Sequence, residues 1–218
     1  MNLKSLGINT VSFDIGNTLI NLEGVLGLCT YFCKKTGLKV DDIRDVLNEY
    51  FLKKNVGIEE SVKEACEKLQ IENYESIVLG YKNLDEIPRI YPDVINTLKK
   101  LKTEGYRIIA CSNCTKCDAD ISNHQIYSYF DNVFYSFEIG YAKPEIEFFN
   151  YVTRVIKADG SDILHIGDSI KADYYAARAA GWRAILLDRK GCNERPNIPM
   201  IHSLNELTSK HSSDTFII

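Results

Sequence analysis

Five short apolar runs are the feature that most restricts the folds open to this chain. They lie at residues 10–14, 107–111, 132–135, 163–166 and 184–187. Helix-like stretches separate the last four runs, and this alternation is typical of βαβ units that build a parallel sheet. The sequence therefore predicts an α/β fold with a doubly wound parallel sheet of about five strands.

Three helix-like stretches agree with this alternation. The first opens at Pro92 and stops at Gly105, the second opens at Pro144, and the third covers about residues 170–180. Proline favours the first turn of a helix, and glycine favours its end. The predicted inward face of the second stretch carries Ile146, Phe149, Val152 and Ile156.

The segment between the first and second predicted strands differs from the rest of the chain. Residues 22–88 show no strand pattern and carry four amphipathic patterns with a helical period instead. A segment of this size is able to bury a small core of its own. We therefore expect a helical subdomain at 22–88, inserted into an α/β core domain made of residues 1–21 and 89–218.

Composition limits the partners and the location of the chain. The formal net charge of −4 argues against a general nucleic-acid binder. No apolar run is long enough to span a bilayer, and residues 1–10 show no signal-peptide pattern. The seven scattered cysteines favour reduced thiols over a disulfide framework. We expect a cytoplasmic protein that binds neither nucleic acid nor membranes, and the sequence leaves its oligomeric state open.

Polar residues stand where the predicted strands end. Asp14 closes the first run, Ser112 and Asn113 follow the second, Lys143 precedes a helix start after the third, and Asp168 follows the fourth. Each residue alone would be interpreted as a turn former, a helix cap or a solvated charge. Because ligands bind beyond the carboxyl ends of strands in an open parallel sheet, the ordered set predicts one shared site.

This ordered set resembles the four motifs of the haloacid dehalogenase-like (HAD) hydrolases. The first motif is Phe13-Asp14-x-x-x-Thr18, and the others are centred on Ser112, on Lys143 and on Asp168, the last continuing to Asp173. The resemblance implies a phosphatase-type member with a Rossmann-like core. It also implies that the helical insertion is a cap of the first type, which closes over the active site.

The resemblance implies a magnesium site. Asp14 would be the nucleophile that forms an aspartyl-phosphate. Mg²⁺ would be held by Asp14, Asp168 and the backbone carbonyl of Gly16. Asp173 would orient the surroundings of the metal rather than touch it.

The resemblance also implies how the substrate is held. Lys143 would place a fixed positive charge against the transferred phosphoryl group. Ser112 would hydrogen-bond a phosphate oxygen, and Asn113 and Thr18 would position the loops and the phosphate. The substrate would be a small phosphorylated metabolite, selected by the cap.

Gly16 departs from the family pattern. Most phosphatases of the family have a second Asp at this position, which protonates the leaving oxygen and then activates water. A positioned acid or base of this kind contributes roughly 10²–10⁴-fold in rate. The first interpretation is a phosphatase for substrates with good leaving groups, such as anomeric sugar, acyl or aryl phosphates. Family members with a similar Asp-x-Gly-Asn loop are believed to be phosphatases, which favours this interpretation.

Two other interpretations remain open. The first is a different reaction: dehalogenases lack the second Asp but use no metal, and phosphonate hydrolases use a cap lysine, for which Lys53 or Lys54 could be proposed. The acidic motif from Asp168 to Asp173 argues against a dehalogenase. The second is a protein that binds phosphate or a partner without turnover. Asp14, Ser112, Lys143 and Asp168 are all present, and this argues against a member of the family that has lost its catalytic activity.

Two smaller features have plain structural interpretations. His165 lies inside an apolar run, and strand alternation predicts a core residue that faces away from the Asp168 loop. Cys111, Cys114 and Cys117 form a C-x₂-C-x₂-C pattern, but a metal site would need a fourth ligand. We therefore expect these cysteines to be small strand and loop residues.

Overall fold

A parallel sheet of six strands forms the centre of the molecule. The structure is a computed structural model that describes residues 3–85, 87–121, 124–193 and 197–208. In spatial order the strands are β5 Asn132–Tyr135, β4 Arg107–Ser112, β1 Thr10–Phe13, β6 Ile163–Gly167, β7 Arg183–Leu187 and β8 Met200–Ile201. The predicted α/β fold is confirmed. The sequence predicts five of these strands, and it misses β8 because a two-residue strand gives no periodic signal.

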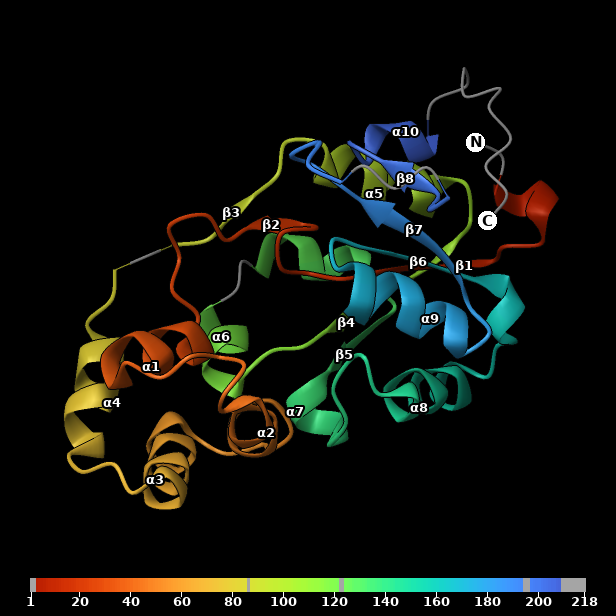
Figure 1. Cartoon of the computed structure of the whole chain (residues 1–218). Helices are drawn as coiled ribbons and strands as arrows, with labels where there is room; N and C mark the ends of the chain where they lie inside the picture. Colours follow the sequence, from red (N-terminus) through yellow and green to blue (C-terminus); the bar gives the residue numbers. More distant parts are fainter. Residues whose placement is uncertain (1–2, 86, 122–123, 194–196, 209–218) are drawn as a thin grey trace.

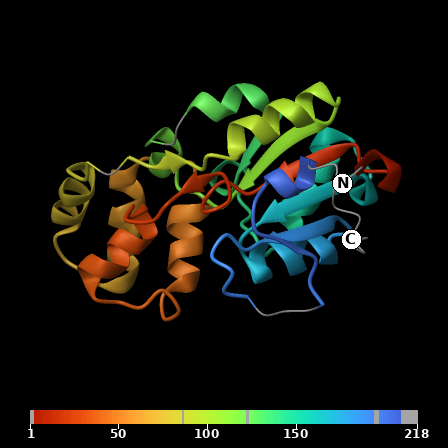
Figure 2. The same cartoon turned by 90° about the horizontal axis from the view of Figure 1, so that it is seen from above.

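Helices cover both faces of the sheet (Figures 1 and 2). Helices α5 Val94–Thr103 and α10 Asn205–Thr208 pack on one face, and α8 Ile146–Ile156 and α9 Ala176–Ala179 pack on the other. Because side chains alternate along a strand, β4 sends Ile108 to the first cluster and Ile109 to the second. The chain is therefore doubly wound, with one apolar core on each side of the sheet.

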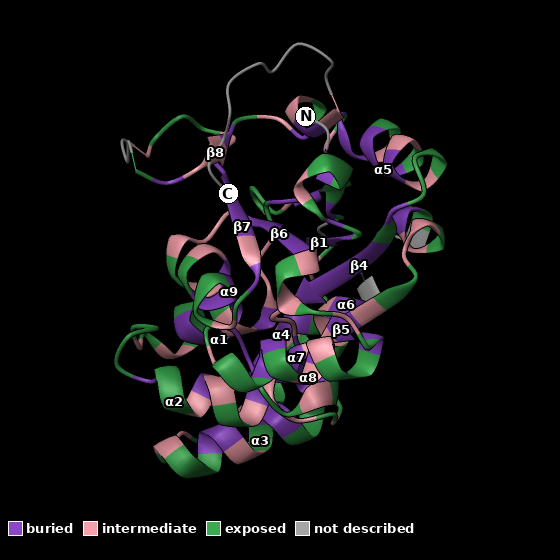
Figure 3. Cartoon of the chain, turned by 90° about the vertical axis from the view of Figure 1, so that its right-hand side faces the viewer, coloured by how far each residue is buried: buried purple, intermediate pink, exposed green. Residues whose placement is uncertain are grey.

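The remaining elements around the sheet are short. They are η1 Leu3–Leu6, α6 Lys116–Ile121, η3 His124–Tyr129, α7 Ser136–Ile139, η4 Gly160–Asp162 and η5 Ile170–Tyr175. Figure 3 shows that burial is concentrated in the strands and in the helix faces turned toward them. In the part of the chain that the structure describes, no helix combines the length and the apolar composition that crossing a bilayer requires.

The helices of the 22–88 segment form a separate group beside the sheet (Figure 1). They are α1 Leu28–Thr36, α2 Arg44–Leu47, η2 Asn48–Leu52, α3 Ile58–Leu69 and α4 Tyr74–Lys82. Their buried side chains make a third apolar cluster, in which the rings of Phe32 and Phe51 lie 5.1 Å apart. A short antiparallel pair, β2 Ile20–Asn21 and β3 Arg89–Ile90, leads into and out of this segment.

One predicted helix face differs in detail from the observed face. Ile146 is 40% exposed on α8, whereas Phe148 is fully buried. The buried face is centred on Phe148, Phe149, Val152 and Ile156, and Ile146 lies off it in the first turn. The helix itself lies where the sequence predicts it.

Candidate active site

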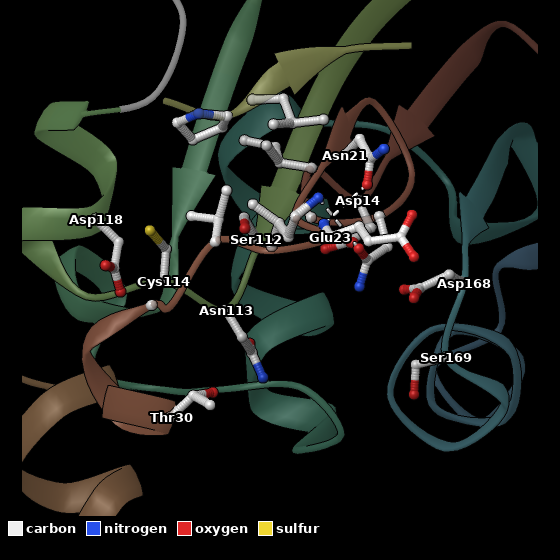
Figure 4. A pocket seen from close by; sticks show the side chains of 18 of the residues that line it. Asp14, Asn21, Glu23, Thr30, Ser112, Asn113, Cys114, Asp118, Asp168 and Ser169 are labelled. Carbon is white, nitrogen blue, oxygen red and sulfur yellow. Dashed lines mark hydrogen bonds between the residues drawn. The ribbon is translucent and has the colours of Figure 1, made fainter. Parts of the chain in front are cut away.

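A cavity of about 920 Å³ lies at the carboxyl ends of β1, β4 and β6, next to the helices of the 22–88 segment. Asp14, Ser112, Asn113, Lys143 and Asp168 all line it. Figure 4 labels four of these side chains, those of Asp14, Ser112, Asn113 and Asp168, around the cavity. The structure therefore brings together residues that are distant in sequence but stand at neighbouring strand ends.

Lys143 is the centre of the charge network in this cavity. Its Nζ donates to Asp14 Oδ1 at 2.7 Å, to Asp173 Oδ1 at 2.6 Å and to the carbonyl of Cys111 at 2.9 Å. An ammonium group has three protons, so all of its donors are used. Burial alone would lower the pKa of Lys143, but the two carboxylates outweigh burial and raise that pKa above its usual value. Lys143 is therefore a fixed positive charge.

Asp14 and Asp168 are neighbouring carboxyls, and both burial and repulsion from other carboxylates disfavour their charged forms. Burial, with added repulsion from Asp173 and Asp168, raises the pKa of Asp14 to about 7, although Lys143 opposes the change. Burial and Asp173 also raise the pKa of Asp168 to about 6. Carboxylate oxygens of Asp14, Asp168 and Asp173 all lie within 4.8 Å of one another. Such a group of hard oxygen ligands fits a divalent cation, whose charge would relieve the repulsion.

Both carboxylate oxygens of Asp173 already have protein partners. Oδ1 accepts from Lys143 and lies 3.1 Å from His165 Nε2, and Oδ2 accepts from the backbone N–H of Ser169 at 2.9 Å. Although burial opposes it, Lys143 and His165 hold the pKa of Asp173 well below its usual range. Gly167 permits this packing, because a Cβ there would stand 2.3 Å from the carboxyl carbon of Asp173. Asp173 is therefore a rigid charged group.

His165 is a core residue, as predicted, but it also contacts the acidic group. It is fully buried, its Nε2 faces Asp173, and its Nδ1 lies 2.9 Å from Ser12 Oγ. The prediction that it faces away from the site was wrong because η5 carries Asp173 back across β6. Burial lowers the pKa of His165. Since a carboxylate only accepts hydrogen bonds, we assign the proton of the neutral ring to Nε2.

Ser112, Asn113 and Thr18 have different surroundings. The side chain of Asn113 donates to the carbonyl of Lys143 at 2.6 Å and accepts from its N–H at 2.8 Å, which fixes the backbone of Lys143. Ser112 is a buried residue at the end of β4 that lines the cavity. Thr18 is not among the lining residues, and its buried hydroxyl has no hydrogen-bond partner within the described ranges.

Gly16 lines the cavity next to a tightly packed neighbour. A Cβ built on Gly16 would meet Leu22 Cδ1 at 3.0 Å. This contact is with the end of a flexible side chain, which is able to shift. A larger residue at position 16 is therefore crowded but not excluded.

Sequence reasoning missed Asn17. Asn17 has a φ of 53°, a left-handed conformation that asparagine tolerates better than most residues. Its side chain hydrogen-bonds Asp168 and accepts from the N–H of Leu22 at 3.4 Å. The Gly16-Asn17 pair was the available signal, because these two residue types favour tight turns.

Asp118 was also missed, and no motif pointed to it. It accepts from the N–H of Leu28 at 3.2 and 3.3 Å, from Thr115 Oγ1 at 2.8 Å, and from the hydroxyl of Tyr81. Leu28 begins α1 and Tyr81 lies in α4, so Asp118 ties both helices to the segment that follows β4. A carboxylate at a helix start is also favoured by the helix dipole.

Arg189 is the third residue without a sequence signal. Its Nη1 and Nη2 donate to the two carboxylate oxygens of Asp93 at 3.0 Å each, and its Nη2 also donates to the carbonyl of Thr18 at 2.7 Å. The guanidinium carbon lies 3.9 Å from the ring centroid of Tyr91. Arg189 therefore joins the end of β7 to both connections that lead to the 22–88 segment.

The lysines and cysteines singled out in the sequence lie in settings that suit structural roles. Lys53 pairs with Glu145, Lys54 pairs with Glu64, and neither lysine lines the cavity. The cysteines of the C-x₂-C-x₂-C pattern are free thiols. Burial raises the pKa of Cys111 to about 12, which disfavours the thiolate that a metal would need.

Comparison with known proteins gives a consistent result. Residues 8–181 match the family model described as haloacid dehalogenase-like hydrolase. Over 187 residues the chain is 26% identical to a glyceraldehyde 3-phosphate phosphatase from Methanocaldococcus jannaschii, covering 80% of this chain and 82% of that protein. Over 137 residues it is 28% identical to an enolase-phosphatase E1 from a Picosynechococcus species, covering 61% of this chain and 59% of that protein.

A solved structure shares the arrangement of the elements. The crystal structure of a HAD phosphatase from Thermococcus onnurineus matches with a TM-score of 0.61 and 24% sequence identity. The match covers 92% of this chain and 96% of that one. At this level of identity the likeness shows a common fold.

Proposed function

The chain belongs to the haloacid dehalogenase-like hydrolase family, and we propose that it is a magnesium-dependent phosphatase of that family. The observation that carries the proposal is the contact of Lys143 with Asp14 and Asp173, with Asp168 beside them, at the strand ends. A fixed cation next to a potential carboxylate nucleophile is suited to binding and attacking a phosphate dianion.

Mg²⁺ is the cofactor that the acidic group fits best. Asp14, Asp168 and the carbonyl of Gly16 would bind it, and Asp173, whose oxygens already have partners, would orient its surroundings. When bound, Mg²⁺ would offset the negative charge of the phosphate and polarise its oxygens. The loss of a side chain at Gly16 leaves the backbone carbonyl in place.

The reaction would proceed in two displacements. A carboxylate oxygen of Asp14 attacks phosphorus, the bond to the leaving oxygen breaks, and that oxygen gains a proton. Water then attacks the phosphorus of the aspartyl-phosphate, the bond to Asp14 breaks, and inorganic phosphate leaves. Lys143 holds its charge through both steps. Ser112 would hydrogen-bond a phosphate oxygen, whereas Asn113 and Thr18 would support the loops.

The substrate class follows from the cavity and from Gly16. A cavity of about 920 Å³ holds a small phosphorylated metabolite with room to spare. The relatives named glyceraldehyde 3-phosphate phosphatase and enolase-phosphatase support a substrate of this size. Because Gly16 has no acid group, we propose a substrate whose leaving group departs easily, such as an anomeric sugar, acyl or aryl phosphate.

The 22–88 segment would be the cap that selects this substrate. It has its own apolar cluster and is joined to the rest through two short strands, β2 and β3. Leu26, Thr30 and Tyr81 from this segment line the cavity together with the strand-end residues. We therefore keep the division into a core domain at 1–21 and 89–218 and a cap at 22–88 as part of the proposal.

The test is hydrolysis of p-nitrophenyl phosphate with and without Mg²⁺. We expect phosphate release with Mg²⁺ and none with a chelator.

Mg²⁺ binding, measured by calorimetry, should also weaken as the pH falls below about 7. The pKa of Asp14 is raised to about 7 and that of Asp168 to about 6, so both carboxyls take up protons in this range. Each displaced proton should cost about tenfold in affinity per pH unit.

Other outcomes would point to another function. Halide release from a 2-haloacid in the presence of chelator would indicate a dehalogenase. Phosphate binding without turnover would indicate a binding protein. A Mg²⁺ affinity that is unchanged between about pH 8 and about pH 5.5 would contradict metal binding by these raised carboxyls.

Gly16→Asp should change the preference for leaving groups. The new carboxyl would supply the proton transfer that Gly16 lacks, so hydrolysis of an alkyl phosphate should rise by about tenfold or more. Hydrolysis of p-nitrophenyl phosphate should change little. Leu22 must shift by a few tenths of an ångström, so Gly16→Ala, which meets the same contact at Cβ without adding a carboxyl, is the matched control. Equal or lower activity of Gly16→Asp toward both esters, with the fold retained, would show that protonation does not limit the rate.

A further inference from the structure

The turn that leaves β2 packs directly over Gly16. The N–H of Leu22 donates to Asn17 Oδ1 at 3.4 Å, and Leu22 Cδ1 lies 3.0 Å from the point where a Gly16 Cβ would stand. The turn therefore occupies the space next to the nucleophile loop into which a side chain at position 16 would extend. Glu23 is the next residue of this turn.

The backbone on both sides of Glu23 is fixed by local hydrogen bonds. The N–H of Glu23 donates to Asn21 Oδ1 at 2.8 Å, and the N–H of Val25 donates to the carbonyl of Leu22 at 3.0 Å. Gly24 has a φ of 81°, which the third position of a type II turn requires. Glu23 thus stands at a defined corner and lines the cavity. Figure 4 shows its side chain in the part of the cavity that holds Asp14 and Asp168.

Glu23 differs from the other carboxylates of the cavity in being unengaged. The acidic residues that line the cavity are Asp14, Glu23, Asp118, Asp168, Asp173 and Asp188. Five of them accept a hydrogen bond from a lysine, an amide, a hydroxyl or a backbone N–H. Within the described residues, the carboxylate of Glu23 has neither a hydrogen bond nor an ion pair, and Glu23 is exposed. The carboxylate oxygens of Glu23 are therefore available to accept a hydrogen bond from a water molecule in the cavity.

We propose that Glu23 is the general base of the second displacement, a role that Gly16 cannot fill. This inference rests on the proposed phosphatase function. In the first displacement the leaving group departs without acid help and its oxygen takes a proton from water. In the second, the carboxylate of Glu23 takes a proton from the water that attacks the aspartyl-phosphate as the bond from phosphorus to Asp14 breaks. Glu23 then passes that proton to bulk water, and the cycle balances.

The decisive variant is Glu23→Gln, which keeps the shape of the side chain and removes proton transfer. With p-nitrophenyl phosphate the aryl group leaves without acid help, so the first displacement should remain fast. The second displacement should slow by about 10²-fold or more. Rapid-mixing absorbance should therefore show about one nitrophenolate per enzyme in a burst, followed by a slow phase. Acid quenching and mass spectrometry should show the phosphoryl group accumulating on Asp14.

A matched control and a rescue separate this role from a structural one. Glu72→Gln removes a carboxyl that is exposed and outside the cavity, and it should behave like the parent. Adding Gly16→Asp to Glu23→Gln should restore turnover and abolish the burst, because a carboxyl again reaches the water from the family position. A packing role for Glu23 would not be rescued in this way.

The outcomes distinguish this inference from the proposed function. A parent protein that releases no phosphate with Mg²⁺ overturns both, since Glu23 then has no step to serve. A parent that is active through Asp14, combined with a Glu23→Gln variant of equal rate or without accumulated phosphoenzyme, overturns only the role of Glu23.

Discussion

Replacing Asp14 with asparagine should reduce hydrolysis of p-nitrophenyl phosphate by about 10⁴-fold or more, because the amide oxygen does not form the aspartyl-phosphate. The variant should stay folded. Asp14 is buried among like charges that raise its pKa to about 7, so a neutral group of the same shape removes repulsion as well as the ion pair with Lys143. Acid quenching should show no phosphoryl group on the protein.

The control for this variant is Asp42→Asn, which removes the same charge from an exposed position outside the cavity. Its rate should stay within about twofold of the parent, as is usual for surface substitutions of small effect. An Asp14→Asn variant that keeps more than a tenth of the parent rate would contradict covalent catalysis by Asp14. Thermal unfolding of both variants at the unfolding temperature of the parent would show that the loss of activity does not come from unfolding.

Replacing Lys143 with methionine should destabilise the protein by about 3–5 kcal/mol, the usual cost of removing one partner from a buried ion pair. Asp14 and Asp173 would lose the ammonium that contacts both of them, and Lys143 is almost fully buried. The rate should also fall by about 10²–10³-fold, since no fixed charge would face the phosphoryl group. Urea unfolding monitored by circular dichroism measures the loss of stability.

The pH dependence of this loss follows from two pKa shifts. The pKa of Asp173 is lowered in the folded state, so its contribution is present above its unfolded value of about 3.9 and is lost as the pH falls. The pKa of Lys143 is raised, so its contribution is present below its unfolded value of about 10.4 and is lost as the pH rises. The difference between parent and variant should therefore be largest near neutral pH and shrink in acid.

An exposed lysine provides the contrast. Lys102 pairs with Asp131 at 2.6 Å, but both side chains are more than a third exposed. Lys102→Met should therefore cost less than about 1 kcal/mol. Equal losses for Lys102→Met and Lys143→Met would show that the buried network has no special energetic role.

The sequence predicted the parts of the molecule that depend on local patterns. The strands β1, β4 and β6 read as apolar runs of four to six residues, and each of them ends at or directly before a polar residue that lines the cavity, as β1 does at Asp14. The prolines at 92 and 144 also predicted helix starts, and α5 and α8 begin two residues after them, at Val94 and Ile146. The short strands β2, β3 and β8 were not visible, because two residues cannot show alternation.

The features that sequence reasoning missed depend on contacts between distant residues. Nothing near Asp118 in the sequence indicates that it accepts hydrogen bonds from α1 and α4. That position 16 carries no carboxyl could be read directly from the sequence. The sequence does not show that Leu22 packs over Gly16 or that Glu23 lines the cavity, because both facts depend on how the chain folds. His165 is a further example. Strand alternation predicts which face of the sheet its side chain is on, but it does not predict that Asp173 from η5 packs against that face.

Arg189 has a consequence for how the cavity could open. Its guanidinium donates hydrogen bonds to the carbonyl of Thr18, just before β2, and to Asp93, just after β3, and it stacks on the ring of Tyr91. Both connections to the 22–88 segment are therefore bound to the end of β7. A rotation that lifted the helices would therefore have to hinge on their own side of the β2–β3 pair. The N–H of Leu22 donates to Asn17 Oδ1 and the N–H of Glu23 donates to Asn21 Oδ1, so Glu23 would stay beside Asp14 while the helices move. Admission of substrate would then leave the proposed base in place.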